Sequence, residues 1–133
     1  MANRPIYPDT IKNAALDVEN GDGTTSQDLL TAGADGARVN YISVISDDTA
    51  DVVLELYYND LTTDSLIGAV TIPAGSGTDG VLPPVSLLNA TALPFLGEDL
   101  AYYLEGADKL KIAAKVAVTA AKKVTLVASY GDY

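Results

Sequence analysis

Hydrophobic and polar side chains alternate through the middle of the chain. In residues 38–46 both alternating sets are largely apolar, which is typical of a central strand covered on both faces. In residues 52–58 valine, leucine and tyrosine alternate with a set that includes Glu55. Residues 66–72 form another strand candidate, which ends at Pro73. We therefore predict three consecutive strands in this region.

The last third of the chain is rich in alanine and lysine, which by intrinsic preference favour helix. Its period is nevertheless two, because apolar residues such as Leu110 and Ile112 occupy every second position. A helix would instead need an apolar stripe at every third and fourth position. We predict two strands, at residues 109–118 and 124–130, joined by residues 119–123.

The remaining segments carry weaker signals. Residues 24–30 are consistent with a short strand. Residues 81–88 contain Pro83 and Pro84, which restricts them to an edge strand or an irregular segment. Residues 98–105 are ambiguous and could form a turn of helix.

Turn-forming residues separate these segments. They lie at residues 20–23, 31–37, 47–50, 59–64 and 75–80. About seven or eight short strands, with turn signals roughly every 8–12 residues and no long helix, predict an all-β fold, an antiparallel β-sandwich or jelly roll. We expect a single β-sandwich domain at residues 13–133, preceded by an N-terminal arm at residues 1–12.

The predicted arm contains Pro5 and Pro8, and proline fixes φ and removes a hydrogen-bond donor. The segment is therefore expected to be extended, either as a frayed terminus or as an arm that lies on a neighbouring subunit. Its apolar and cationic side chains are candidate interface residues. These are Arg4, Ile6, Tyr7, Ile11 and Lys12.

Composition narrows the function classes. The 133 residues are enough for one domain with its own core. The chain has no cysteine and no histidine, which excludes disulfides, thiol nucleophiles, thiolate or imidazole metal ligands and a Ser-His-Asp triad. A net charge of −10 argues against binding to nucleic acid or to an anionic membrane surface. We expect neither a signal peptide nor a membrane-spanning segment.

The charges are unevenly distributed along the chain. Residues 40–108 contain no lysine or arginine, and lysines then cluster between Lys109 and Lys123. One interpretation is an ordinary solvated surface. The other is an acidic region and a basic region that meet complementary neighbours in an assembly. In the second case high salt should weaken attachment, whereas attachment unchanged at molar salt would indicate apolar contacts.

Candidate chemistry is sparse. Asp47, Asp48 and Asp51 are close in sequence, but neighbouring acids in a turn usually serve turn geometry and solubility. Residues 17–23 only superficially resemble a calcium loop, although an oxygen-only Ca²⁺ site stays open as an alternative. Residues 75–80 lack the lysine and the following helix of a phosphate-binding loop. We therefore predict no enzyme activity, no cofactor and no metal site.

Tyrosine is unusually frequent relative to phenylalanine, with eight against one. Adjacent tyrosines in a strand point to opposite faces, so one of each pair is expected to face outward. The alternatives are a tyrosine-containing edge of the core, or contact with another subunit or with a glycan. The candidate interface tyrosines are Tyr57, Tyr102 and Tyr133.

Two stretches together resemble a group of small tailed-phage and prophage proteins. The first is residues 30–42, which contain TAGADGARV, followed after a turn by residues 53–60, VLELYYND. The second is the C-terminal pair of strands, which ends in VASYGDY at residues 127–133. The group has TAGANGSRV, a strand RLFLHDG and an ending GGDY or GGDF. Asn59 replaces the usual histidine, and Tyr130 replaces a glycine of the ending. The resemblance spans about residues 29–133 and is weakest at residues 61–100.

This resemblance implies a virion structural protein with a β-sandwich fold, of the capsid-decoration or cement type. It implies binding to the outer surface of a phage head, with the major capsid protein and further copies of the chain as partners, in a trimer or another cyclic homo-oligomer. The expected location is the capsid surface, after synthesis in the host cytoplasm. The alternative is a carbohydrate-binding β-sandwich module of a head or tail fibre, and a carboxylate hydrolase is the weakest reading.

Overall fold

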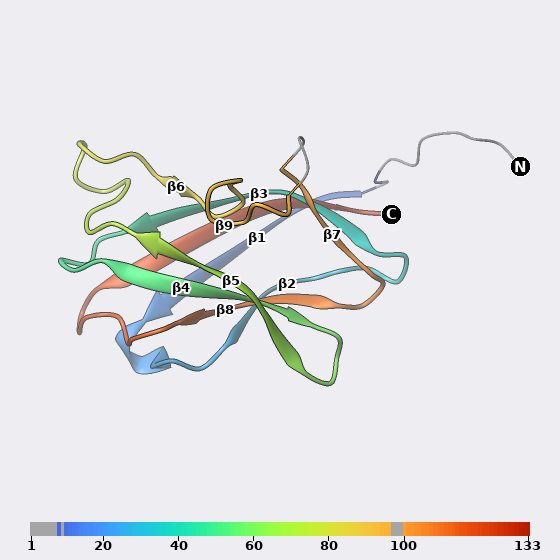
Figure 1. The fold of residues 1–133 in the computed structure, drawn as a ribbon, viewed down its shortest axis with the longest axis horizontal. Coiled ribbons are helices and arrows are strands. Elements are labelled where there is room, and N and C mark those ends of the chain that lie inside the picture. The colour runs from blue at the N-terminus through green and yellow to red at the C-terminus, as the bar shows by residue number, and fades with distance from the viewer. Residues whose placement is uncertain (1–7, 9, 97–99) are drawn as a thin grey trace, which may run out of the picture.

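Nine strands and one short 3₁₀ turn are the regular elements of the computed structural model, which describes residues 8, 10–96 and 100–133 (Figure 1). The elements are β1 (Thr10–Glu19), η1 (Asn20–Asp22), β2 (Gln27–Thr31), β3 (Ala37–Ser46), β4 (Val52–Asn59), β5 (Asp64–Ile72), β6 (Val85–Ser86), β7 (Tyr102–Leu104), β8 (Lys109–Ala114) and β9 (Lys123–Asp132). The all-β prediction is therefore confirmed for the described residues.

The strands form two antiparallel sheets that face each other (Figure 1). Sheet A has the order β1-β9-β3, and β6 and β7 both pair with the remaining edge of β3. Sheet B has the order β2-β8-β4-β5. With β6 and β7 counted as two pieces of one edge strand, these orders are those of a jelly roll.

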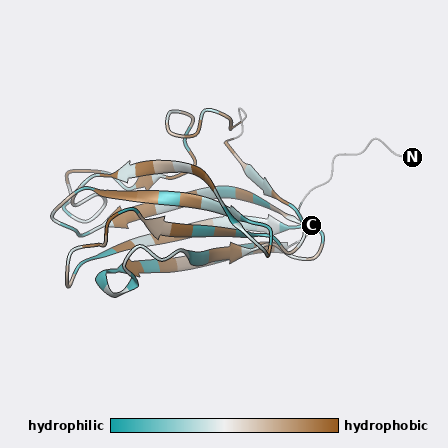
Figure 2. Ribbon diagram, turned by 60° about the horizontal axis from the view of Figure 1, so that its bottom comes forward, coloured by the Kyte–Doolittle hydropathy of each residue, from teal (hydrophilic) through white to brown (hydrophobic). Residues whose placement is uncertain are grey.

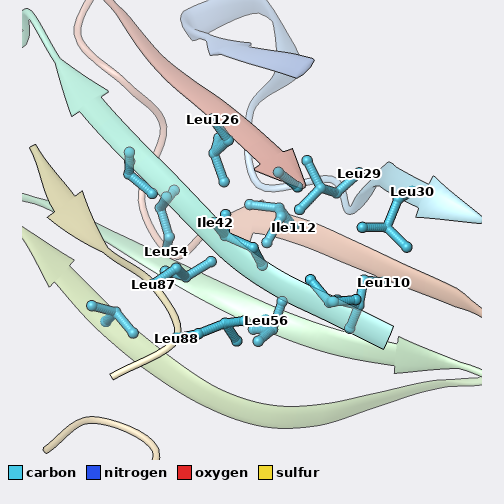
Figure 3. Close-up of a cluster of buried hydrophobic side chains, with 14 of the residues drawn as sticks. Leu29, Leu30, Ile42, Leu54, Leu56, Leu87, Leu88, Leu110, Ile112 and Leu126 are labelled. Atoms are coloured by element: carbon cyan, nitrogen blue, oxygen red, sulfur yellow. The ribbon is translucent and has the colours of Figure 1, made fainter. Parts of the chain in front are cut away.

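The core lies between the inward faces of the two sheets. Hydropathy alternates along the strands, as expected when one face of each strand is buried (Figure 2). Leucine and isoleucine side chains from both sheets meet in the centre (Figure 3). The large side chains that are fully buried are Val18, Val39, Ile42, Val44, Leu54, Leu56, Ile72, Leu87, Leu93, Leu110, Ile112 and Leu126.

The irregular segment after β6 also contributes to the core. Leu87, Leu88 and Leu93 are buried although they lie outside the strands. Gly68 on β5 makes room for one of them, because a Cβ at this position would lie 2.6 Å from Leu93 Cδ2. The prediction of an edge strand or irregular segment at residues 81–88 is confirmed, since only Val85–Ser86 pair with β3 after the two prolines.

Three boundaries differ from the sequence predictions. β1 pairs with β9 from Thr10 onward, so the last three residues assigned to the arm are the start of a strand. Tyr102–Leu104 form a strand against β3 and not a turn of helix, since pairing on the edge of β3 outweighs weak local preference. β8 ends at Ala114 and not at Val118, and the chain that follows is held at Thr119 by hydrogen bonds to Asp48.

We predict that truncating a core leucine destabilises the fold far more than truncating an exposed one. Leu126→Ala removes a fully buried side chain and should lower the free energy of unfolding by about 2–5 kcal/mol. Leu66→Ala, at an exposed position on β5, is the matched control and should change it by less than about 1 kcal/mol. Chemical denaturation measures both, and equal losses would contradict the assignment of the core.

Candidate protein-binding surface

The outward-facing side chains of sheet A form a surface that carries almost no charge in its middle. We call this surface face A. Strand register aligns its residues in rows across β1, β9 and β3. The rows are Ile11–Gly131–Arg38, Asn13–Ser129–Tyr41 and Ala15–Val127–Ser43. The next row ends the uncharged region, because Asp17 lies there and pairs with Lys123 at 3.7 Å.

Large apolar and aromatic side chains are exposed on face A. The exposed fractions are 80% for Ile11, 48% for Tyr41 and 39% for Val127. Tyr103 on β7 lies opposite Arg38 and is 55% exposed. The Arg38 guanidinium lies 5.9 Å from the centre of the Tyr103 ring, and Arg38 Nε donates to Tyr103 Oη at 3.2 Å. The two side chains therefore hold each other in place at one end of face A.

A hollow of about 210 Å³ opens beside Tyr41 at the margin of face A. It lies beside the edge of β3, where short strands pair at two places. β7 pairs with Ala37–Val39 and β6 with Ser43 and Val44, and among the described residues no strand pairs between them. The hollow is lined by Tyr41, Ile42, Ser43, Pro84, Val85 and Ser86.

Contacts with the last residues of β9 hold the N-terminal end of β1 in place. Pro8 packs over Gly131, where a Cβ would lie 2.4 Å from Pro8 Cβ, so the glycine provides the space for this contact. Lys12 Nζ lies 2.7 Å from Asp132 Oδ2, and Gly33 N–H donates to Asp132 Oδ1 at 3.0 Å. Burial alone would raise the pKa of Asp132, but these two partners hold it below its ordinary value.

The outer face of sheet B differs because its charges pair within the chain. Lys109 Nζ lies 2.9 Å from Asp28, and Lys111 Nζ lies 3.6 Å from Asp28 and 3.9 Å from Asp64. Asn59 also donates to Asp64 at 2.6 Å. Several lysines of the basic region thus already have acidic partners in the same chain. This is the arrangement of a solvated, internally paired surface.

Those predicted interface residues that the structure describes do not lie together at one place. Arg4, Ile6 and Tyr7 lie outside the described residues. Ile11 lies on face A, whereas Lys12 is bound to Asp132 within the chain.

The three candidate tyrosines have separate environments. Tyr57 lies on the outer face of sheet B, where burial and the neighbouring Glu55 raise its pKa. Tyr102 packs against the core and meets Phe95 edge-on at 6.3 Å. Tyr133 N–H donates to the carbonyl of Gly36 at 3.1 Å.

Sequence reasoning missed most of face A, notably Tyr41, Val127 and Tyr103. The available signal was the second apolar set in residues 38–46, which was interpreted as the face of a buried central strand. The same absence of charge marks alternate positions of residues 124–130. Only the pairing of β1, β9 and β3 places these sets on one surface.

The acids that were the strongest catalytic candidates hold loops in place. Asp47 accepts from Lys123 N–H and Asp51 from Ala74 N–H. Asp48 is 2% exposed and accepts from both the N–H and the hydroxyl of Thr119, at 2.9 and 2.7 Å. Burial would raise the pKa of Asp48, but hydrogen bonds from Thr119 and Ala50 hold it below its ordinary value.

Tyr58 is another titratable group that is held by a hydrogen bond within the chain. The hydrogen bond to Asp108 raises the pKa of Tyr58 to about 12. In the described part of the chain, no three acidic side chains are grouped so that they could hold a metal ion. No helix among the described residues is both long and apolar enough to cross a membrane.

Comparison with known proteins finds similarity in structure but not in sequence. No protein-family model and no curated protein matches the chain. A chain of the acidic stable capsid structure of Helicobacter pylori bacteriophage KHP30 is similar with a TM-score of 0.60, at 14% identity, over 94% of this chain and 90% of that chain. Its fold is therefore shared with this protein.

Two further solved structures are more distant. A chain of the cyanophage Pam1 capsid asymmetric unit has a TM-score of 0.49 at 16% identity, covering 100% of this chain and 94% of that chain. The Drosophila NLP-core, whose structure concerns pentamer formation and histone binding, has a TM-score of 0.47 at 9% identity, covering 92% and 97%.

We predict that Asp48→Asn destabilises the fold by about 1–3 kcal/mol at pH 7, because an amide nitrogen replaces one of the two accepting oxygens. The pKa of Asp48 is lowered in the folded state, so its contribution is present above the ordinary value of 3.8 and is lost as the pH falls through the lowered pKa. The difference between wild type and variant should therefore shrink below about pH 4.

Denaturation of both proteins between pH 3 and pH 7 measures this difference. Asp51→Asn is the control, since exposed Asp51 accepts one hydrogen bond that asparagine can also accept. A deficit for Asp48→Asn that stays constant over this pH range would contradict the proposed role of the carboxylate.

Proposed function

We propose that this chain is a structural protein of a phage particle and that it decorates the outer surface of the capsid as a cement protein. The observation that carries the proposal is the fold shared with a chain of the KHP30 capsid structure, over nearly the whole length of both chains. The sequence stretches that resemble small tailed-phage proteins point the same way. They include the loop after β2 and the end of β9.

The described surface supports a binding role and not a catalytic one. Face A exposes aromatic and apolar side chains on β9 and on the two long strands that flank it. The grouped acids Asp47, Asp48 and Asp51 are each engaged by a backbone N–H group. A cement protein needs a stable surface and no reaction, which agrees with this distribution of side chains.

Size suggests how such a protein would act. Four strand widths of about 4.8 Å and a length of nine residues at about 3.4 Å limit face A to roughly 400–600 Å². A standard stable interface takes about 800 Å² from each partner. Attachment of one copy is therefore modest, and many copies on one shell would reinforce it collectively.

The proposal includes two partners, the major capsid protein and further copies of the same chain. A small cyclic homo-oligomer such as a trimer would let several copies of face A engage the shell at once. The protein would be made in the host cytoplasm and would join the virion at the capsid surface.

We predict that the protein is found in purified phage particles at a copy number comparable to that of a capsid subunit. Quantitative mass spectrometry of gradient-purified particles measures this ratio. Particles made without the gene should break at lower temperature, and purified protein should restore their stability because it bridges neighbouring subunits. Particles that contain no copies of the chain would refute the proposal.

A further inference from the structure

We infer that face A is the surface that lies against the capsid shell, so that the outer face of sheet B points to solvent. This inference rests on the proposed function and assigns the docking side. The occupant it commits to is an uncharged protein surface of the shell that presents a protruding apolar side chain. A second copy of this chain is the competing occupant.

The residue composition of face A is typical of a protein interface. Protein interfaces are depleted in charged residues at their centre and enriched in tyrosine and arginine, which also dominate binding energy. The three central rows of face A contain one charged residue, Arg38, in a chain whose net charge is −10. Tyr41 and Tyr103 are about half exposed on the same side of the sheet. Contact of a protein with the middle of face A therefore costs little desolvation of charge.

The hollow at the margin of face A can accept a side chain of a partner. The hollow beside Tyr41 measures about 210 Å³ and is lined by apolar and hydroxyl side chains, among them Val85 and Ser86. It lies at the margin of face A and has room for one apolar side chain of a partner. Buried anchors of this kind in a small pocket carry much of the energy of an interface.

Ion pairs on the opposite side of the molecule favour the same orientation. The outer face of sheet B carries Asp28, Lys109 and Lys111 in a paired cluster. Covering such ion pairs removes their hydration, and the desolvation cost can exceed the Coulombic gain. This cost favours exposure of the outer face of sheet B in the assembly.

Area decides between the shell and a second copy. Roughly 400–600 Å² is less than the approximately 800 Å² per partner that a stable pair of free subunits takes. A shell that presents many identical positions does not need each contact to be strong alone. We therefore assign face A to the shell and expect any contact between copies to use another surface.

Matched lysine substitutions test the assignment. Val127→Lys places a cation in the middle of face A, and Leu66→Lys places the same charge on exposed β5 in sheet B. Both positions are partly open to solvent in the free chain, so both variants should fold, which circular dichroism and thermal melting check. Co-sedimentation with particles that lack the protein measures binding.

We expect Val127→Lys to bind at least about tenfold more weakly than wild type, because its charge is desolvated, and Leu66→Lys to bind within about twofold. Tyr41→Ala, which removes one wall of the hollow, should also weaken binding. Binding of wild type should change little between 0.1 and 1 M salt, since the contact is largely uncharged.

The outcomes separate this inference from the proposed function. Failure of the wild type to bind particles overturns the proposed function, and the inference with it. Wild-type binding that Val127→Lys leaves unchanged, or that Leu66→Lys abolishes, overturns the inference alone. If Val127→Lys instead dissociates an oligomer of the free protein and leaves capsid binding intact, as judged by analytical ultracentrifugation, face A is a contact between copies and the inference is wrong.

Discussion

The pairing of β9 with β1 on one edge and β3 on the other is the constraint on which the rest of the structure depends. Because side chains alternate along a strand, β9 supplies Leu126 to the core and Val127 to the outer surface at the same time. Its last residues also hold the start of β1, since Gly131 accommodates Pro8 and Asp132 binds Lys12. The same strand pairing therefore places core residues on one face of sheet A and the residues of face A on the other.

Exposed apolar groups and charges are distributed differently on the outer faces of the two sheets. Sheet B satisfies its outward charges locally, so it can remain in water at little cost. Sheet A leaves aromatic and apolar groups exposed between β1 and β3, where no described element covers them. Acidic side chains elsewhere, such as Asp48, are engaged in holding loops. The surface chemistry therefore agrees with a protein that binds other proteins through one sheet.

Local sequence was sufficient to predict the strands whose alternation is strong, such as β3, β4 and β9. It did not predict β1, because the stretch around Asn13 and Ala14 has little intrinsic strand preference and is held by pairing with β9. Local sequence patterns could not predict the strand order of the jelly roll either, because β1 and β9 pair although they are the first and last strands in the sequence. Face A depends on that order, and of the predicted interface residues that the structure describes, only Ile11 lies on it.

The most direct test of the account is the position of the chain in a reconstruction of the phage particle by electron cryomicroscopy. The account predicts density for the jelly roll on the outer surface of the capsid, with β1, β9 and β3 toward the shell and the Asp28–Lys109 pair toward solvent. Density with sheet B against the shell would contradict the assigned orientation. A particle whose density has no place for this fold would contradict the structural role itself.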